Sequence, residues 1–257
     1  MDIIIISLVT FFAALLTFFS GFGLGTILTP VMLLYFPVEI AIAFTGIVHF
    51  SNNIFKLFII GKNINKNVLI RFGIPAIIAA FFGSFLLIYL NEYSILYTIN
   101  INSTLREITT IKFVISLLLI VFAVIDLIPF FKKLSFKQNS LPIGGIMSGF
   151  FFVLTGNQGA LRSAFLIKII INKKEFIATT VVISSLVDIS RLSVYSSYIL
   201  NINLDEYYVL GFFSVCSAII GSIIGNKLLK KVTIDFIRFL VAVLILIIAT
   251  ALLVGLI

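Results

Sequence analysis

Two glycine-rich stretches, one in each half of the chain, carry residue types suited to binding a small ion. Residues 20–30 read SGFGLGTILTP, and residues 154–163 read LTGNQGALRS. Glycine frees the backbone from helical geometry, and a helix that restarts after such a break presents unpaired N–H groups and the positive end of its dipole. That arrangement suits an oxyanion. The candidate substrate-binding residues are Gly23, Gly25, Thr26, Gly156, Asn157, Gln158, Gly159, Arg162 and Ser163.

The second break is the more polar of the two. Arg162 brings a guanidinium that could pair with a planar or tetrahedral oxyanion, and Asn157 and Gln158 have no packing rationale. Two simpler interpretations stay open. The glycines could only permit close helix packing, and Arg162 could sit at the inner surface of a shallow hairpin.

A stripe of polar side chains at helical spacing marks the apolar segment that follows each break. In the first half it contains His49, Asn52, Asn53 and Lys56, and in the second Ser184, Ser185, Asp188 and Arg191. Such residues in a membrane helix usually face the bundle interior or a wet path. Alternatively, Asp188 and Arg191 form a structural ion pair, and Lys56 and Arg191 snorkel to opposite surfaces. The candidate coupling or gating residues are Glu39, His49, Asn52, Lys56, Asp188 and Arg191; among them Glu39, His49 and Asp188 are candidate proton carriers.

Other chemistries find little support in the sequence. No metalloprotease, nucleophile-elbow or phosphate-loop signature occurs, so we expect no enzyme and no catalytic residues. The single histidine and single cysteine leave no metal cluster, and no cofactor is expected. The G-x-G spacing of the first break has no preceding strand, which excludes a dinucleotide-binding unit.

Composition identifies the solvent of these elements as the lipid bilayer. Hydrophobic residues make up 61% of the 257 residues and charged residues only 11%, with a mean hydropathy of +1.26. A soluble domain has about 45 to 50% apolar and about 25% charged residues. The net charge of +8 resides mainly in short loops, where it is an orientation signal and not a nucleic-acid surface. We expect an all-α, multi-pass protein of the cell membrane.

Eight apolar segments divide into two related sets of four, which predicts an ancient duplication. Residues 1–135 would form the first membrane repeat and residues 136–257 the second, both within one integral membrane domain. Gly23 corresponds to Gly156, and Lys56 to Arg191. The segments lie at about residues 3–36, 39–60, 68–90, 109–128, 141–171, 175–199, 207–228 and 233–256.

Loop charges predict that the two repeats are inverted. The loops near residues 61–67, 132–137, 173–174 and 227–231 are basic and belong on the cytoplasmic side, whereas residues 91–110 and 201–208 are balanced or acidic. Inversion requires an odd number of crossings per half. The first segment of each half is therefore expected to be a broken or re-entrant helix hairpin, entering from opposite sides; a tilted, kinked crossing is the alternative.

The glycine cluster, Thr29-Pro30, the apolar run, Pro37 and Ala41 to Thr45 together resemble the sulfite exporter TauE/SafE family of membrane permeases. The second copy, from Gly156 to Thr180, resembles it too, so the likeness covers nearly the whole chain. The resemblance implies secondary transport of sulfur-containing anions such as sulfite, sulfonates or thiosulfate. Leu24 interrupts the first glycine run, and Ser163 stands where the family's second copy tends to have proline.

The sequence thus predicts a secondary transporter of a small anion, working by alternating access, with the substrate between the two breaks. An anion channel is the nearest alternative, and a membrane-embedded enzyme or assembly factor is a more distant one. The expected partners are the anionic substrate and the lipid bilayer. No nucleic acid is expected, and a homodimer is compatible with the sequence.

Overall fold

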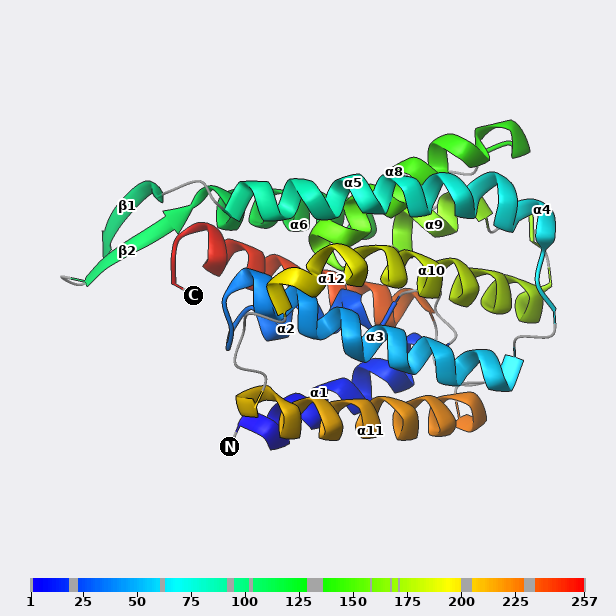
Figure 1. The fold of residues 1–257 in the computed structure, drawn as a ribbon, viewed down its shortest axis with the longest axis horizontal. Coiled ribbons are helices and arrows are strands. Elements are labelled where there is room, and N and C mark those ends of the chain that lie inside the picture. The colour runs from blue at the N-terminus through cyan, green and yellow to red at the C-terminus, as the bar shows by residue number, and fades with distance from the viewer. Residues whose placement is uncertain are drawn as a thin grey trace.

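The protein is a bundle of membrane-length helices with a short β-hairpin at one end, as seen in the computed structural model (Figure 1). The structure describes residues 2–18, 23–60, 63–91, 95–101, 104–128, 136–157, 159–166, 168–170, 172–199, 205–228 and 234–256. Five described helices are long and apolar enough to cross a bilayer. They occupy Val38–Ile60, Lys66–Leu90, Thr110–Leu127, Lys174–Ser196 and Tyr207–Lys227.

The first half begins with two short helices in place of one crossing. Helix α1 (Asp2–Thr17) has 16 residues and α2 (Gly25–Met32) has 8, or about 24 and 12 Å at 1.5 Å per residue. Each is shorter than the hydrocarbon layer of about 30 Å. The half continues with α3 (Val38–Ile60), α4 (Lys66–Val68), a π-helical turn η1 (Leu69–Gly73), α5 (Ile74–Asn91) and α6 (Thr110–Leu127).

The second half repeats this order. A 3-10 turn η2 (Gln138–Ser140) leads into α8 (Leu141–Thr155), which ends at Gly156 and is followed by the 8-residue α9 (Gly159–Leu166). The long helices α10 (Lys173–Ile199), α11 (Asp205–Leu228) and α12 (Ile234–Leu253) complete it. Both halves therefore open with a helix of 15 or 16 residues, a break and an 8-residue helix.

Helices of the two halves pack in matched pairs. Helix α1 packs along α11 and α8 along α5, while α3 packs against α10 and α6 against α12. In Figure 1 the colours show that α3 runs from left to right and the adjacent α10 from right to left, and that α11 and α12 reverse the directions of α5 and α6. Equivalent helices thus run in opposite directions.

Glycines set the closest of these contacts. A Cβ atom on Gly149 of α8 would lie 2.0 Å from the carbonyl oxygen of Ala76 in α5, and one on Gly221 of α11 would lie 2.3 Å from that of Phe11 in α1. Small residues allow such backbone approach between membrane helices, where packing and not burial from water drives association. Glycines therefore allow close backbone contact in two helix pairs, α5 with α8 and α1 with α11.

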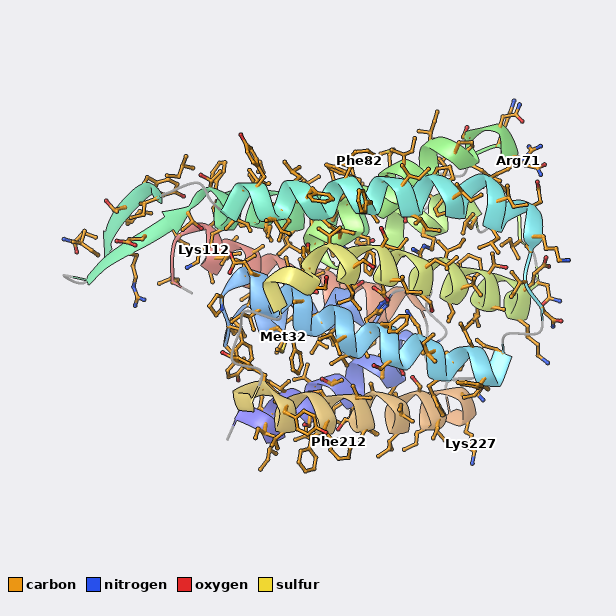
Figure 2. All side chains as sticks on the ribbon, viewed as in Figure 1. Met32, Arg71, Phe82, Lys112, Phe212 and Lys227 are labelled. Carbon is orange, nitrogen blue, oxygen red and sulfur yellow. The ribbon has the colours of Figure 1, made fainter. Side chains whose placement is uncertain are left out.

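The exposed positive charges of the helix ends gather at one end of the molecule. Arg71 and Lys227 lie there in Figure 2, and so does α4, which carries Lys66. The opposite end holds the start of α1, the end of α12 and the β-hairpin. The helix ends next to these basic loops therefore lie on one side of the molecule, which is the side predicted to be cytoplasmic.

The β-hairpin is a departure from the all-α expectation. Strands β1 (Ile95–Ile101) and β2 (Thr104–Thr109) pair antiparallel, with Ile99 opposite Arg106. Residues 91–110 were predicted only to be a connection of balanced charge, although their alternating β-branched and polar residues are typical of strands. The hairpin contacts the chain end, since the Tyr97 hydroxyl donates to the Leu253 carbonyl oxygen at 2.9 Å.

Candidate functional site

The two glycine breaks lie against each other in the centre of the bundle. A Cβ atom on Gly25 would sit 3.2 Å from the Gly156 carbonyl oxygen, and one on Gly156 would sit 2.2 Å from the Thr29 hydroxyl oxygen. Gly156 has a φ of 70°, a left-handed conformation that glycine adopts without strain. The Thr26 hydroxyl lies 3.5 Å from the Gly156 carbonyl oxygen.

This contact concerns two residues of the predicted substrate site. Gly25 and Thr26 are predicted to bind an anion held between the breaks, and in this structure both lie in direct contact with Gly156. The amide nitrogen of Thr26 also already donates to the Gly23 carbonyl oxygen at 3.0 Å. The amide nitrogens of Ile27 and Leu28 likewise donate to the Leu24 carbonyl oxygen, at 3.2 and 3.0 Å, so the described start of α2 makes its own backbone hydrogen bonds.

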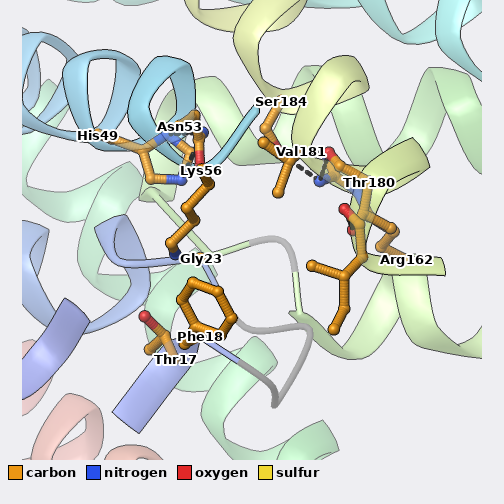
Figure 3. A pocket seen from close by; sticks show the side chains of 11 residues that line it. Thr17, Phe18, Gly23, His49, Asn53, Lys56, Arg162, Thr180, Val181 and Ser184 are labelled. Carbon is orange, nitrogen blue, oxygen red and sulfur yellow. Dashed lines mark hydrogen bonds between the residues drawn. The ribbon is translucent and has the colours of Figure 1, made fainter. Parts of the chain in front are cut away.

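A small cavity lies beside the breaks (Figure 3). Its volume is about 30 Å³, and one ordered water needs roughly 10 to 15 Å³ by the same measure. The cavity therefore suits a small ion or about two waters. Its lining comes from both halves: Thr17, Phe18, Gly23, His49, Asn53, Lys56, Arg162, Ile177, Thr180, Val181 and Ser184.

Arg162 of α9 is the most distinctive residue of this cavity. Only 1% of it is exposed, so the interpretation that it sits at a membrane surface is wrong. Its Nη1 atom donates to the Thr180 carbonyl oxygen at 3.2 Å and to the Ser184 hydroxyl. Its Nε and Nη2 atoms are buried without an acceptor among the described residues. Buried polar groups usually have a hydrogen-bond partner, and a guanidinium forms its strongest hydrogen bonds with carboxylates and other oxyanions.

Lys56 faces Arg162 across the cavity from the other half of the chain. Figure 3 shows its side chain reaching toward Phe18, and its Nζ atom lies 5.3 Å from the centre of that ring. Lys56 is 4% exposed, so it does not snorkel to a surface. Its described contacts include this cation–π interaction but no carboxylate within salt-bridge distance.

His49, Asp188 and Arg191 form a second buried cluster that joins the cavity through His49. The Asp188 carboxylate lies 2.6 Å from His49 Nδ1 and 2.7 Å from Arg191 Nη2. Arg191 is fully buried, and its guanidinium lies 4.8 Å above the centre of the Phe152 ring. Asp188 and Arg191 thus form the ion pair within one helix, and Arg191 does not snorkel either.

The remaining candidates are dispersed. Asn52 accepts a hydrogen bond of 2.7 Å from the Ser222 hydroxyl, and the Asn157 side chain donates to Asp126 at 3.5 Å. Glu39 lies in a separate pocket of about 420 Å³ with Lys112, so it does not join the cluster. Gln158 and the side chain of Ser163 lie outside the described residues, while the backbone of Gly159 begins α9.

Asp126 is a buried carboxylate that was not among the predicted site residues. It is 4% exposed near the end of α6 and contacts Asn157 in the second break. The signal was available, because a carboxylate within an apolar membrane segment is rare and usually functional. Among the described residues, no group of three or more His, Cys, Asp or Glu side chains is placed to hold a metal ion.

A comparison with protein families identifies the family of this chain. A profile of the family described as Sulfite exporter TauE/SafE matches residues 6–252 of this chain, which includes both breaks and both polar stripes. No curated protein and no solved structure matches the sequence. Because the profile covers nearly the whole chain, this protein belongs to the sulfite exporter TauE/SafE family.

Proposed function

We propose that this protein is a secondary transporter that carries a small sulfite-type oxyanion across the cell membrane by alternating access. Membership of the family implies a membrane transporter of sulfite-type anions. The five helices of spanning length make it a multi-pass membrane protein. Its substrate, mechanism and membrane are the parts we infer.

The observation that carries the proposal is the pairing of Arg162 and Lys56 around one cavity. Both are buried cations, one from each half, and neither is neutralised by a carboxylate within salt-bridge distance among the described residues. A charge without a partner in a low-dielectric interior is expensive, so such residues persist where a ligand supplies the opposite charge. An oxyanion between them would satisfy Arg162 Nε and Nη2 and the Lys56 ammonium together.

Alternating access is supported by the relation between the halves. We infer two inverted repeats, residues 1–135 and 136–257, because equivalent helices run in opposite directions and pack in matched pairs. Inverted repeats place a binding site near the midplane at broken helices and expose it to each side in turn. The half-length α1 and α8, each followed by a short helix, fit the re-entrant hairpins expected from the loop charges.

A channel is less consistent with this geometry. A channel needs a continuous wet path when open, whereas here the breaks are in contact and the cavity between the cations measures about 30 Å³. A membrane-embedded enzyme has no specific observation in its favour. The transporter is therefore the function that the arrangement of charges supports best.

Flux measurements on the purified protein in liposomes test this proposal. Uptake of radiolabelled sulfite should saturate with concentration, and vesicles loaded with unlabelled sulfite should show a transient overshoot of label. Protein-free vesicles give the background. A flux that rises linearly without overshoot would indicate a channel, and the absence of flux for sulfite, thiosulfate and small sulfonates would refute anion transport.

A further inference from the structure

Each half places one buried cation over a phenylalanine that lies shortly before its glycine break. Lys56 lies over Phe18, which directly follows α1, and Arg191 lies over Phe152 in α8, four residues before Gly156. Lys56 and Arg191 also match in the sequence alignment of the halves. If the repeats alternate, Arg191 of the second half binds the anion when the site faces the outer side. Lys56 of the first half binds it when the site faces the inner side.

The cavity of the present structure lies beside Lys56, at the first of these two places. The cavity is lined by the later part of α3 and the early part of α10, both of which lie toward the end that carries Arg71 and Lys227. The equivalent outer place is filled. A Cβ atom on Gly46 would meet Arg191 Nε at 3.1 Å, and the glycine breaks are in contact beside it.

One substitution between the halves breaks the equivalence. The position three residues before Lys56 is Asn53, a neutral side chain that lines the cavity, whereas the position three residues before Arg191 is Asp188. Lys56 is therefore available to an anion, while Arg191 is held by a carboxylate 2.7 Å away. An anion can use Arg191 only when the charge of Asp188 is removed.

We propose that Asp188 couples a proton to anion transport by competing with the anion for Arg191. This inference rests on the proposed function and adds its coupling ion. When the site opens to the outer side, a proton from the outer water neutralises Asp188, and the released Arg191 then binds the oxyanion. When the outer side closes again, Asp188 and Arg191 re-form the ion pair seen here.

His49 gives the proton a way out to the inner cavity. Its Nδ1 atom contacts Asp188 Oδ2 at 2.6 Å, and the same side chain lines the cavity between Lys56 and Arg162. The Asp188 carboxyl passes its proton to one imidazole nitrogen, and the other nitrogen releases a proton to water in the cavity. One proton and one anion then cross together, and the steps run in reverse for export.

The charged surroundings of Asp188 favour this assignment. The groups that face the Asp188–His49 pair are His49 and Lys56 of α3, Arg191 of α10 and Arg162 of α9. Helices α2, α5 and α8 contain no Asp, Glu, Lys or Arg at all, and the titratable Tyr195 lies on α10 near Arg191. Asp188 is thus the carboxylate among three buried cations, and its protonation decides how many of them are free.

The experiment counts protons per sulfite in liposomes that contain a pH-sensitive dye. Sulfite itself carries protons, so the comparison is between variants at one pH. Wild-type protein should move one more proton per sulfite than Asp188→Asn, in which Arg191 is always free. Sulfite-for-sulfite exchange should persist in Asp188→Asn. The matched control Glu107→Gln removes an exposed carboxylate from the β-hairpin and should keep the wild-type ratio.

Equal proton ratios in wild type and Asp188→Asn would overturn the coupling role while leaving transport itself intact. If Asp188→Asn does not fold, Asn53→Asp carries the test, because a carboxylate beside Lys56 should add one proton per sulfite. An unchanged ratio there would equally contradict the proposal. Loss of sulfite flux in the wild type would instead refute the proposed function.

Discussion

At the residue scale, three buried cations in one bundle differ in how their charge is balanced. Arg191 has Asp188 at 2.7 Å, whereas Lys56 and Arg162 have no carboxylate within salt-bridge distance among the described residues. Burying a charge is tolerated when it is paired, and breaking a buried pair leaves an uncompensated charge. The three residues should therefore respond differently to removal.

Arg162→Ala should weaken sulfite transport strongly. A hydrogen bond to a charged group contributes about 1.5 to 3 kcal/mol, so losing this donor should raise the KM for sulfite roughly 10- to 150-fold. Initial rates of labelled sulfite uptake measure the effect. Arg71→Ala, which removes an exposed arginine from η1, should leave KM unchanged. Equal KM values for the two variants would remove Arg162 from the binding site.

Lys56→Met and Arg191→Met should shift stability in opposite directions. Methionine at position 56 removes an unpaired buried ammonium, so the melting temperature in detergent should hold or rise. Methionine at position 191 leaves Asp188 unpaired and should destabilise by about 3 to 5 kcal/mol. Thermal unfolding of both variants checks this contrast. A loss of stability in Lys56→Met as large as in Arg191→Met would mean that Lys56 has a structural anion partner.

At the element scale, the sequence predicted the segments and their breaks but not how the breaks meet. Glycine runs and apolar lengths are local signals, which is why both broken first segments were identified. The direct contact of Gly25 with Gly156 depends on the packing of helices far apart in sequence, so it could not be predicted from either glycine run alone. The burial of the polar stripes was predicted for the same local reason, because exposing such residues to lipid is unfavourable.

Close helix packing makes a prediction about glycines that are not in the breaks. Gly149→Ala should destabilise the protein by about 1 to 3 kcal/mol, because the new Cβ would lie 2.0 Å from the Ala76 carbonyl oxygen. In Gly211→Ala the nearest described atom is at 3.8 Å, and helix propensity favours alanine. Melting temperatures in detergent compare the two. Equal tolerance would show that α5 and α8 do not pack this closely.

At the scale of the whole molecule, loop charge predicts the orientation. Arg71 and Lys227 lie at one end, while the β-hairpin, the start of α1 and the half-buried Lys112 lie at the other. Loop charges predicted this grouping because the positive-inside bias acts on each short loop separately. The hairpin was not predicted, because residues 91–110 were interpreted only by their charge and not by their strand pattern.

Cysteine labelling tests the orientation directly. In a Cys216→Ala background, Arg106→Cys on the hairpin should react with an impermeant maleimide in intact cells, and Lys227→Cys at the end of α11 only after permeabilisation. Both positions are exposed. Labelling of both cysteines from the same side would refute the proposed inverted topology.

The central claim is that one oxyanion binds between Arg162 and Lys56, and equilibrium binding tests it most directly. Radiolabelled sulfite should bind the purified protein at one ion per chain. Both Arg162→Ala and Lys56→Met should lose that binding, while Arg71→Ala should retain it. Binding that is unchanged in Arg162→Ala and Lys56→Met, with both variants folded, would contradict the site described here.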